Sequence, residues 1–462
     1  MDLLIISAIF GIIMMFAGLW VNNKNTLGNI AIAGFAILSV AGIAALNGTN
    51  IFTQIKGSET MLAFGRKEYY FITLTCLATV LYLILCVKPL VAIGHYAAEY
   101  LALLFFITCG IIISVSFQNL LMLFLGIEII SIPLYILTGS DKQNLKSNEA
   151  SLKYFLMGAF STGILLMGIA LIYGATGSFS LAGIIKETQG VSVIYAIGVI
   201  LLFVALCFKV SAAPFHFWTP DVYDGAPTAV TAYMATIAKG ASFLAFLQLF
   251  QTSFSGRVSA AWMYMLMFII IATLVIGNLT AVFQQSVKRM MSYSSIAQAG
   301  FMLFALMAIN STNANEGLVL YTLVYTLASL GIFAVLVRIK DYTFDGFNGL
   351  AKKEPLVALA TTICLFSLAG IPLTGGFMGK WYMLQAVASN SEYWWLIFVA
   401  VLLAAVSIFY YFKVIQAMYF KTGEALTITP FTSTVKIALV AIVVVLLAAG
   451  IFPSFFTSFL IF

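Results

Sequence analysis

The sequence is poor in charge: only 8% of its 462 residues are Asp, Glu, Lys or Arg, whereas soluble domains carry about 25%. Hydrophobic residues make up 63% of the chain, which is more apolar surface than a soluble fold buries. We therefore expect lipid to be the solvent for most of the chain. The net charge of +6 lies in short loops between apolar runs, so it does not indicate a nucleic-acid partner.

Motifs that bind cofactors or metals are also missing. Five cysteines are scattered through apolar runs without a CxxC pair, namely Cys76, Cys86, Cys109, Cys207 and Cys364. Iron–sulfur and zinc sites need clustered ligands, so we interpret these residues as small buried hydrophobic side chains without disulfides. The sequence has neither a P-loop nor a Gly-x-Gly-x-x-Gly motif after a strand, so it predicts no redox cofactor in this chain.

What the chain does contain is a series of long apolar runs. A membrane-spanning helix needs about 20 mostly apolar residues. Such runs lie at about 3–20, 27–47, 70–88, 100–117, 119–138, 151–173, 191–213, 227–250, 260–282, 293–309, 317–338, 356–389, 393–419 and 436–458. Counting 356–389 as one interrupted helix, the pattern predicts an all-α integral membrane protein with about fourteen spans. The first run lacks the features of a signal peptide, so we expect it to be a membrane helix.

The loops between these runs differ in positive charge. Fourteen Lys and Arg residues lie in the odd-numbered loops and five in the even-numbered loops. Because positive loops face the cytoplasm, we expect both termini on the outer, periplasmic side. His95, in one short connection, is interpreted as incidental.

Four ionisable residues fall within the apolar runs: Glu128, Lys209, Lys239 and Lys380. An ionisable group at the bilayer centre costs ~2.5–3.5 kcal/mol on insertion scales, so such groups mark transport paths. Snorkelling to the headgroups explains Lys153, which begins a span, better than Lys239, which lies deep within one. A lysine near a glutamate in a dry site forms a switchable proton site, because each stabilises the charged form of the other.

Prolines lie close to three of these charges: Pro133 after Glu128, Pro214 after Lys209 and Pro372 before Lys380. A proline inside a helix frees the carbonyl four residues earlier, here those of Val210 and Leu368 for the second and third prolines. Broken helices beside ionisable groups are typical of secondary transporters. For Pro133, a simple packing kink is an equally good interpretation.

Other polar residues near the first break have two possible roles. His216 can relay protons or merely cap the loop after Pro214. Asp221 and Asp224 are interpreted as caps of the helix that follows rather than proton carriers. Pro, Lys and Trp recur around the second break, five helices later, which suggests two repeats of five helices.

At this point the residues resemble a known family. The segments KVSAAPFHFWTPDVYDGAPTAVTAYMATIAKGAS (209–242), GIEIISIPLY (126–135), KRMMSYSSI (288–296) and GGFMGK (375–380) are similar to motifs of the antiporter-like subunit N family of bacterial NADH:quinone oxidoreductase, respiratory complex I. The resemblance covers about residues 100–420, and the first segment is highly specific.

The resemblance implies a fold of two inverted five-helix repeats with broken helices 7 and 12. The repeats would occupy 100–250 and 251–420, after an N-terminal three-helix segment (1–99) and before a last helix (421–462). It also implies roles for single residues: Glu128 pairs with Lys209, Lys239 is the central lysine, Lys380 feeds the proton outlet, Lys153 modulates the pair and His216 lies on the hydrated path. In the tenth helix relatives often have His, whereas this chain has Gln298, which does not titrate near pH 7, so a path there needs water.

The function implied by the resemblance is proton translocation in the membrane arm, coupled to quinone reduction. NADH, FMN, iron–sulfur clusters and quinone would bind partner subunits, and the neighbours would be the sibling subunit M and small helical subunits in a bacterial plasma (inner) membrane. An Mrp-type cation/proton antiporter subunit shares the fold, but the loop from Trp218 to Pro227 favours subunit N. Sibling M typically has Glu in place of Lys380. A non-transporting scaffold would need none of the buried lysines.

Overall fold

The computed structural model describes residues 1–49, 58–94, 96–187, 192–253 and 260–458, and within these ranges it contains helices and isolated bridges but no strand. Two of the five basic residues counted in the even-numbered loops, Lys56 and Arg257, lie outside the described residues, as does His95. In lipid a helix satisfies all its backbone groups internally, which is why long apolar runs adopt it. Twelve described helices are long and apolar enough to cross a membrane, so the predicted all-α membrane fold is confirmed.

The helices of spanning length are α1 (Asp2–Trp20), α2 (Lys24–Leu46), α3 (Arg66–Ala92), α4 (Ala97–Ser116), α5 (Leu120–Thr138), α6 (Leu145–Thr176), α12 (Ala260–Val282), α13 (Val287–Met307), α14 (Thr312–Leu336), α18 (Trp394–Phe420), α19 (Ser433–Ile451) and a composite of α10 (Thr228–Tyr233), the π-helical η2 (Met234–Ala238) and α11 (Lys239–Ser253). The shorter ones are α7 (Leu181–Glu187), α8 (Val193–Lys209), α9 (Trp218–Gly225), α15 (Leu350–Lys353), α16 (Pro355–Ala369), α17 (Gly375–Ala388) and α20 (Pro453–Thr457). Three 3₁₀ turns complete the list: η1 (Ser58–Thr60), η3 (Phe344–Phe347) and η4 (Ser391–Tyr393).

Two predicted spans are interrupted helices. The run at 356–389 consists of α16 and α17. Gly370 directly follows α16, and its φ of +84° is one that a residue with a side chain rarely adopts. The run at 191–213 is α8, followed by a non-helical segment and then α9. The count of fourteen spans requires each interrupted pair to cross the membrane as one unit, and it stays a prediction, as do the two repeats.

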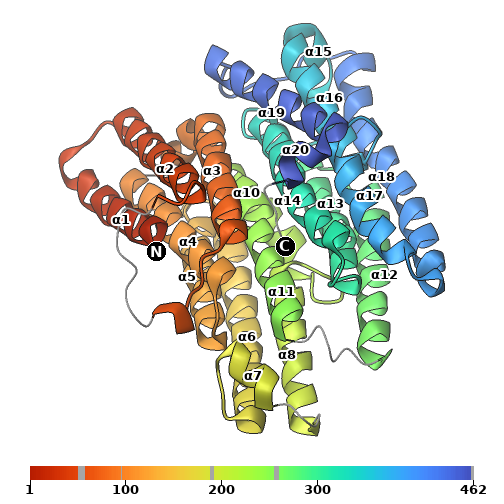
Figure 1. Cartoon of the computed structure of the whole chain (residues 1–462). Helices are drawn as coiled ribbons and strands as arrows, with labels where there is room; N and C mark the ends of the chain where they lie inside the picture. The colour runs from red at the N-terminus through yellow and green to blue at the C-terminus, as the bar shows by residue number, and fades with distance from the viewer. Residues whose placement is uncertain (50–57, 95, 188–191, 254–259, 459–462) are drawn as a thin grey trace.

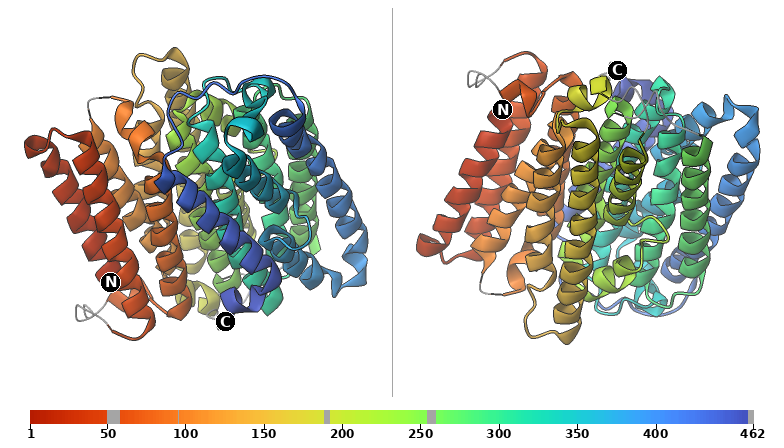
Figure 2. Two further views of the ribbon diagram at one scale, coloured as in Figure 1. Left: turned by 90° about the horizontal axis from the view of Figure 1, so that it is seen from above. Right: turned by 90° about the horizontal axis from the view of Figure 1, so that it is seen from below.

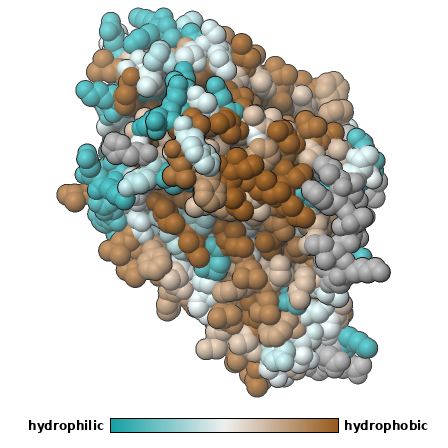
Figure 3. Space-filling model, turned by 90° about the vertical axis from the view of Figure 1, so that its left-hand side faces the viewer, coloured by the Kyte–Doolittle hydropathy of each residue, from teal (hydrophilic) through white to brown (hydrophobic). Residues whose placement is uncertain are grey.

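The helices form one bundle, which the chain crosses from α1 and α2 at one side to α18 at the other (Figures 1 and 2). The most apolar stretches of α13, α14 and the α10–α11 composite are 94% buried, whereas that of α1 is 28% buried. The core therefore lies along these three central helices, and the five cysteines are all buried, as the sequence predicts. Apolar side chains cover the middle of the face in Figure 3, with hydrophilic ones gathered at its upper-left margin, as expected for a lipid-facing surface.

The first and last helices meet at the same end of α3. Asp2 of α1 interacts electrostatically with Tyr69, and the hydroxyl of Tyr70 donates a hydrogen bond to the carbonyl of Phe456 in α20 (2.7 Å). Both ends of the described chain therefore lie on one side of the bundle. Which side of a membrane that is remains a prediction from the loop charges.

Candidate functional site

Glu128 on α5 and Lys209 at the end of α8 lie together, 4.0 Å apart between Oε1 and Nζ. One hydroxyl group bridges them, and a second contacts the lysine alone. Thr162 on α6 donates a hydrogen bond to Glu128 Oε1 (2.7 Å) and accepts one from Lys209 Nζ (3.5 Å). Lys209 also donates to the hydroxyl of Ser131 (2.9 Å). The structure thus brings Glu128 and Lys209 together as the sequence suggests, and the Thr162 hydroxyl bridges them.

The interruption after α8 leaves Lys209 at a helix end. Ser211 has a φ of +64°, so the backbone leaves the helical path here. The chain returns to a helix at Trp218, the first residue of α9. Its indole N–H donates to the carbonyl of Phe208 in α8 (3.1 Å), which attaches the two halves to each other.

A cavity of about 30 Å³ connects the surroundings of Lys209 and Lys239. Both lysines line it, together with Ile127, Ile130, Ser131, Leu134, Tyr154, Trp218, Tyr223, Met234, Ala238 and Ser242. A cavity of 10–15 Å³ holds one water molecule, so this one has room for about one or two. The two lysines and four hydroxyl-bearing side chains among these residues can supply polar partners for that water.

Lys239 is buried at the point where the π-helical segment η2 ends, and its side chain points to α13. Its Nζ donates to the carbonyl (2.6 Å) and the hydroxyl (3.1 Å) of Ser295. No carboxylate lies within 4 Å of Lys239 among the described residues. π-helical turns are rare and often occur at functional sites, which fits a lysine held by neutral groups in the centre of the bundle.

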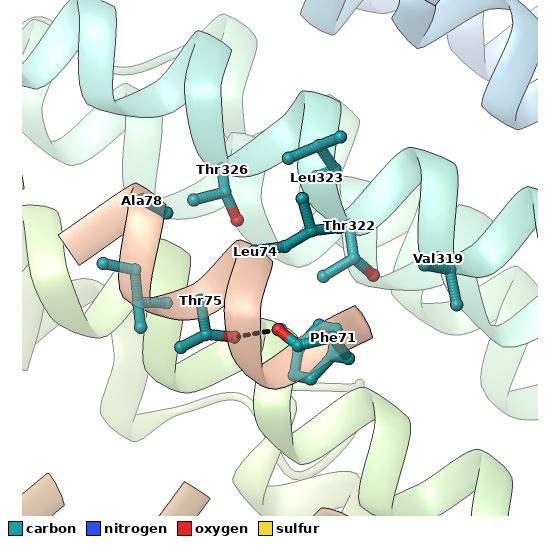
Figure 4. Close-up of a pocket in the computed structure, with 10 residues that line it drawn as sticks. Phe71, Leu74, Thr75, Ala78, Val319, Thr322, Leu323 and Thr326 are labelled. Atoms are coloured by element: carbon teal, nitrogen blue, oxygen red, sulfur yellow. Dashed lines mark hydrogen bonds between the residues drawn. The ribbon is translucent and has the colours of Figure 1, made fainter. Parts of the chain in front are cut away.

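A second, smaller cavity of about 20 Å³ lies on another face of the same composite helix (Figure 4). Gly240 lines it beside residues of α3 and α14, and Thr322 and Thr326 on α14 face Thr75 on α3 across it. A side chain at position 240 would overlap Thr322, so the glycine permits close packing of α11 on α14. Each of Thr75 and Thr322 donates its hydroxyl proton to its own helix, which leaves oxygen lone pairs available.

Lys380 lies in α17, just beyond the second interruption. Its Nζ donates to the carbonyl of Leu368 (2.8 Å) and lies 3.4 Å from that of Ala369, both at the end of α16. The prediction that the break frees the Leu368 carbonyl is therefore confirmed, and the lysine is one of its partners. The ammonium group also lies 4.3 Å from the centre of the Phe301 ring, a cation–π contact with α13.

Gln298 on α13 links Lys380 to a buried polar network. Its amide nitrogen donates to the same Leu368 carbonyl (3.0 Å) and to the Tyr411 hydroxyl (3.1 Å), and its oxygen accepts from Tyr321 (2.5 Å). Tyr411 also shares a hydrogen bond with Ser294, the neighbour of the residue that binds Lys239. The Gln298 amide therefore has hydrogen-bond partners at both its nitrogen and its oxygen, and it lies on the helix that also binds Lys239.

Lys153 lies apart from the Glu128–Lys209 pair. Its Nζ forms ion pairs with Glu149 (2.7 Å) and with Asp221 of α9 (2.9 Å), and 43% of its side chain is exposed. Arg289 of α13 binds the other oxygen of Asp221 (2.8 Å). Burial raises the pKa of Asp221, but hydrogen bonds from Lys153 and Arg289 outweigh it, so the pKa lies below its usual range.

The prediction that Asp221 and Asp224 cap the next helix is wrong. The cap position of α10 is Pro227, which forms no side-chain cap, and Asp221 lies within α9, where it binds two cations. Its partners come from α6 and α13, so sequence spacing could not identify them. His216 is buried in the interruption, with its ring 4.6 Å from that of Phe217, and it does not line the cavity between the lysines.

Sequence reasoning missed the neutral side chains of this site. Thr162, Ser131 and Ser295 are hydroxyl residues within apolar helices, where they commonly bond to their own backbone, and nothing in the sequence marks them. It also placed Lys288 in a loop, whereas only 3% of this residue is exposed. The apolar run that begins at about 293 could have indicated this, because helix α13 extends that run by six residues toward the N-terminus and begins at Val287.

Comparisons with known proteins agree on one family. Residues 118–407 match the family described as NADH:quinone oxidoreductase/Mrp antiporter, transmembrane. The chain is 37% identical to NADH-quinone oxidoreductase subunit N of Trichlorobacter lovleyi, with 98% of this chain and 94% of the relative aligned. It superposes on a chain of respiratory complex I from Thermus thermophilus with a TM-score of 0.83 at 31% identity, covering 98% and 97% of the two chains. A chain of the Mrp complex from a Dietzia species has a TM-score of 0.85 at 20% identity over 99% and 96%, a likeness of fold.

Proposed function

Because this chain belongs to the NADH-quinone oxidoreductase subunit N family, we propose that it moves protons along a relay of Glu128, Lys209, Lys239 and Lys380. It is a multi-pass membrane protein and a proton-translocating membrane-arm subunit of that enzyme complex. Redox chemistry, with NADH, FMN, iron–sulfur clusters and quinone, belongs to partner subunits. The membrane is a bacterial inner membrane, with both termini outward.

The observation that carries this proposal is the cavity shared by Lys209 and Lys239. Lys209 has a carboxylate partner 4.0 Å away, whereas Lys239 is held by neutral groups. Opening of the Glu128–Lys209 pair removes the counter-charge from Lys209, and water in the cavity provides the path for its proton to Lys239. Such a step needs no cofactor in this chain.

The second half of the relay runs along α13. Lys239 contacts Ser295, and the neighbouring Ser294 is hydrogen-bonded to Tyr411, which in turn contacts Gln298. Gln298 and Lys380 share the Leu368 carbonyl. In this proposal the hydroxyl groups and local water carry the proton, while Gln298 holds the tyrosines in place. Lys380 then releases the proton toward the outer side.

Lys153 and His216 have secondary roles in the proposal. Lys153 lies on the same helix as Thr162, which bridges the Glu128–Lys209 pair, so its ion pair with Asp221 adjusts how α6 and α9 lie beside that pair. His216 lies in the interruption between α8 and α9, close in sequence to both Lys209 and Trp218. It serves the hydrated side of the break rather than the cavity itself.

Filling the cavity tests the proposal. Ala238 lines it, so Ala238→Val should exclude its water and lower NADH-driven proton uptake by inverted membrane vesicles at least about tenfold, given that the space holds only one or two waters. Ala241→Val is the matched control, because Ala241 is also buried but does not line this cavity, so any general overpacking effect appears in both variants.

Three outcomes of this experiment are informative. Loss of uptake in the Ala238 variant, with an assembled complex and an active control, supports the relay. Full uptake in that variant shows that protons do not pass through this cavity. Unchanged respiration with loss only of sodium tolerance identifies the Mrp-type antiporter activity instead.

A further inference from the structure

Lys288, in the first turn of α13, is a buried lysine that the proton relay does not use. Its Nζ donates to the carbonyls of Asp224 (2.9 Å) and Ala226 (2.6 Å), and only 3% of the residue is exposed. Its third neighbour is the ring of Tyr342, whose centre lies 5.3 Å away. In the described part of the chain no carboxylate oxygen lies within 4 Å of this ammonium group.

The two carbonyls that Lys288 binds belong to the end of α9. The last carbonyls of a helix have no partner within it, and a cation there is stabilised by the helix dipole as well as by hydrogen bonds. The next residue, Arg289, also contacts α9, since its guanidinium group donates to the carboxylate of Asp221. Two consecutive residues of α13 therefore hold α9 by its backbone end and by its carboxylate.

The position of α9 matters for the cavity described above. Trp218 and Tyr223, both on α9, form part of the cavity wall between Lys209 and Lys239. Seven residues after Lys288, the same helix α13 presents Ser295 to Lys239. The helix α13 thus contacts both α9, which carries part of the cavity wall, and Lys239 at the far side of the cavity.

We propose that Lys288 is a positioning residue that fixes α9, and with it the aromatic wall of the cavity, in register with Lys239. The functional half of this inference rests on the proposed relay, whereas the fixing of α9 does not. Lys153 contributes from the other side through Asp221, but its side chain is half-exposed and lies at the surface. Lys288 is the buried attachment, and its removal takes away the donor that binds the Asp224 and Ala226 carbonyls.

The test uses the intact complex and the Lys288→Met variant, which keeps the length of the side chain and removes its charge and donors. Hydrogen–deuterium exchange of segment 218–228 should rise about tenfold, because the buried carbonyls lose their partners and local opening becomes easier. Exchange in the helical part of α5 should stay unchanged. Proton uptake per NADH should fall at least about twofold, with NADH oxidation by a soluble acceptor unaffected, since loosening α9 disturbs only the cavity.

Lys413→Met is the matched control. Lys413 also donates to a helix-terminal carbonyl, that of Val282 (3.0 Å), and lies over an aromatic ring, but it does not contact α9. Lys288→Arg should restore slow exchange, and Lys288→Gln, which keeps an N–H donor without the charge, should give an intermediate rate. The glutamine variant also provides the measurement if the methionine variant does not assemble.

The outcomes separate this inference from the proposed function. Unchanged exchange of 218–228 in both the methionine and glutamine variants overturns the positioning role, as does an equal rise in the Lys413 control. Faster exchange in that segment alone supports it. If exchange rises and proton uptake stays complete, α9 is held by Lys288 as inferred, and the cavity as a proton route is refuted.

Discussion

Replacing Glu128 by Gln removes one negative charge from the site and changes little else. The amide has the same shape, and its oxygen can still accept the hydrogen bond that Thr162 now donates to Glu128 (2.7 Å). What disappears is the attraction between two charges 4.0 Å apart. At an effective dielectric constant of about 20, this attraction amounts to about 4 kcal/mol.

Solvent reduces that figure, because 22% of the Glu128 side chain and 10% of the Lys209 side chain are exposed. We therefore take the effect as about 2 to 4 kcal/mol, which corresponds to a factor of about 30 to 1000 in an equilibrium. Moving one charge against 100 mV requires ~2.3 kcal/mol. Opening and closing this ion pair thus changes the energy of Lys209 by an amount similar to the work of transport.

In the glutamine variant Lys209 never gains or loses its counter-charge, so the switch cannot operate. We expect NADH-driven proton uptake by inverted vesicles to fall at least about 30-fold in an assembled complex, the lower end of the range above. Glu149→Gln is the control: Glu149 pairs with Lys153, but its side chain is 64% exposed, and such surface pairs contribute only about 0–1 kcal/mol. Complete proton uptake in the Glu128 variant would refute the electrostatic switch.

Three further predictions follow from the geometry. Gln298→Leu should lower proton uptake, and it should lower the free energy of unfolding by about 1–3 kcal/mol for each buried partner left unsatisfied. Gln298→His should retain uptake; vesicle assays measure the uptake of both variants, and thermal unfolding measures their stability. Gly376→Ala should prevent assembly of a stable complex, because a Cβ atom would overlap the carbonyl oxygen of Ser367; native electrophoresis measures this, and normal yield would contradict it. The pKa of Asp221 is lowered by its two basic partners, so its ion pairs are fully formed above its usual pKa of about 3.9 and are lost only as pH falls through the lower folded value. The hydrogen exchange of α9, corrected for intrinsic rates, should therefore be constant from about pH 6 to 8. A step in that range would contradict the assignment.

The two interrupted helices differ in how much of their surroundings could be predicted from the sequence. The Gly-Ile-Pro segment before Lys380 predicted the break, and covalent geometry even identified the freed Leu368 carbonyl. At the first break the same logic located Lys209, but the roles of Asp221 and Asp224 were wrong. The difference is that the freed Leu368 carbonyl follows from the local position of Pro372, whereas the role of Asp221 depends on partners from the distant helices α6 and α13.

The sequence by itself determined that lipid surrounds most of the chain, which segments are helices and which charged residues lie among apolar ones. Length and hydropathy decide which segments cross lipid, since a chain in lipid must satisfy its backbone within each segment, and any charge left inside stands out against apolar neighbours. Tertiary structure alone decided which neutral groups surround those charges. Thr162 bridges Glu128 and Lys209, and Ser295 holds Lys239, only because packing brings distant helices within hydrogen-bond distance. Hydroxyl side chains also bond to their own helix, so their sequence pattern is the same whether or not a charge lies beside them.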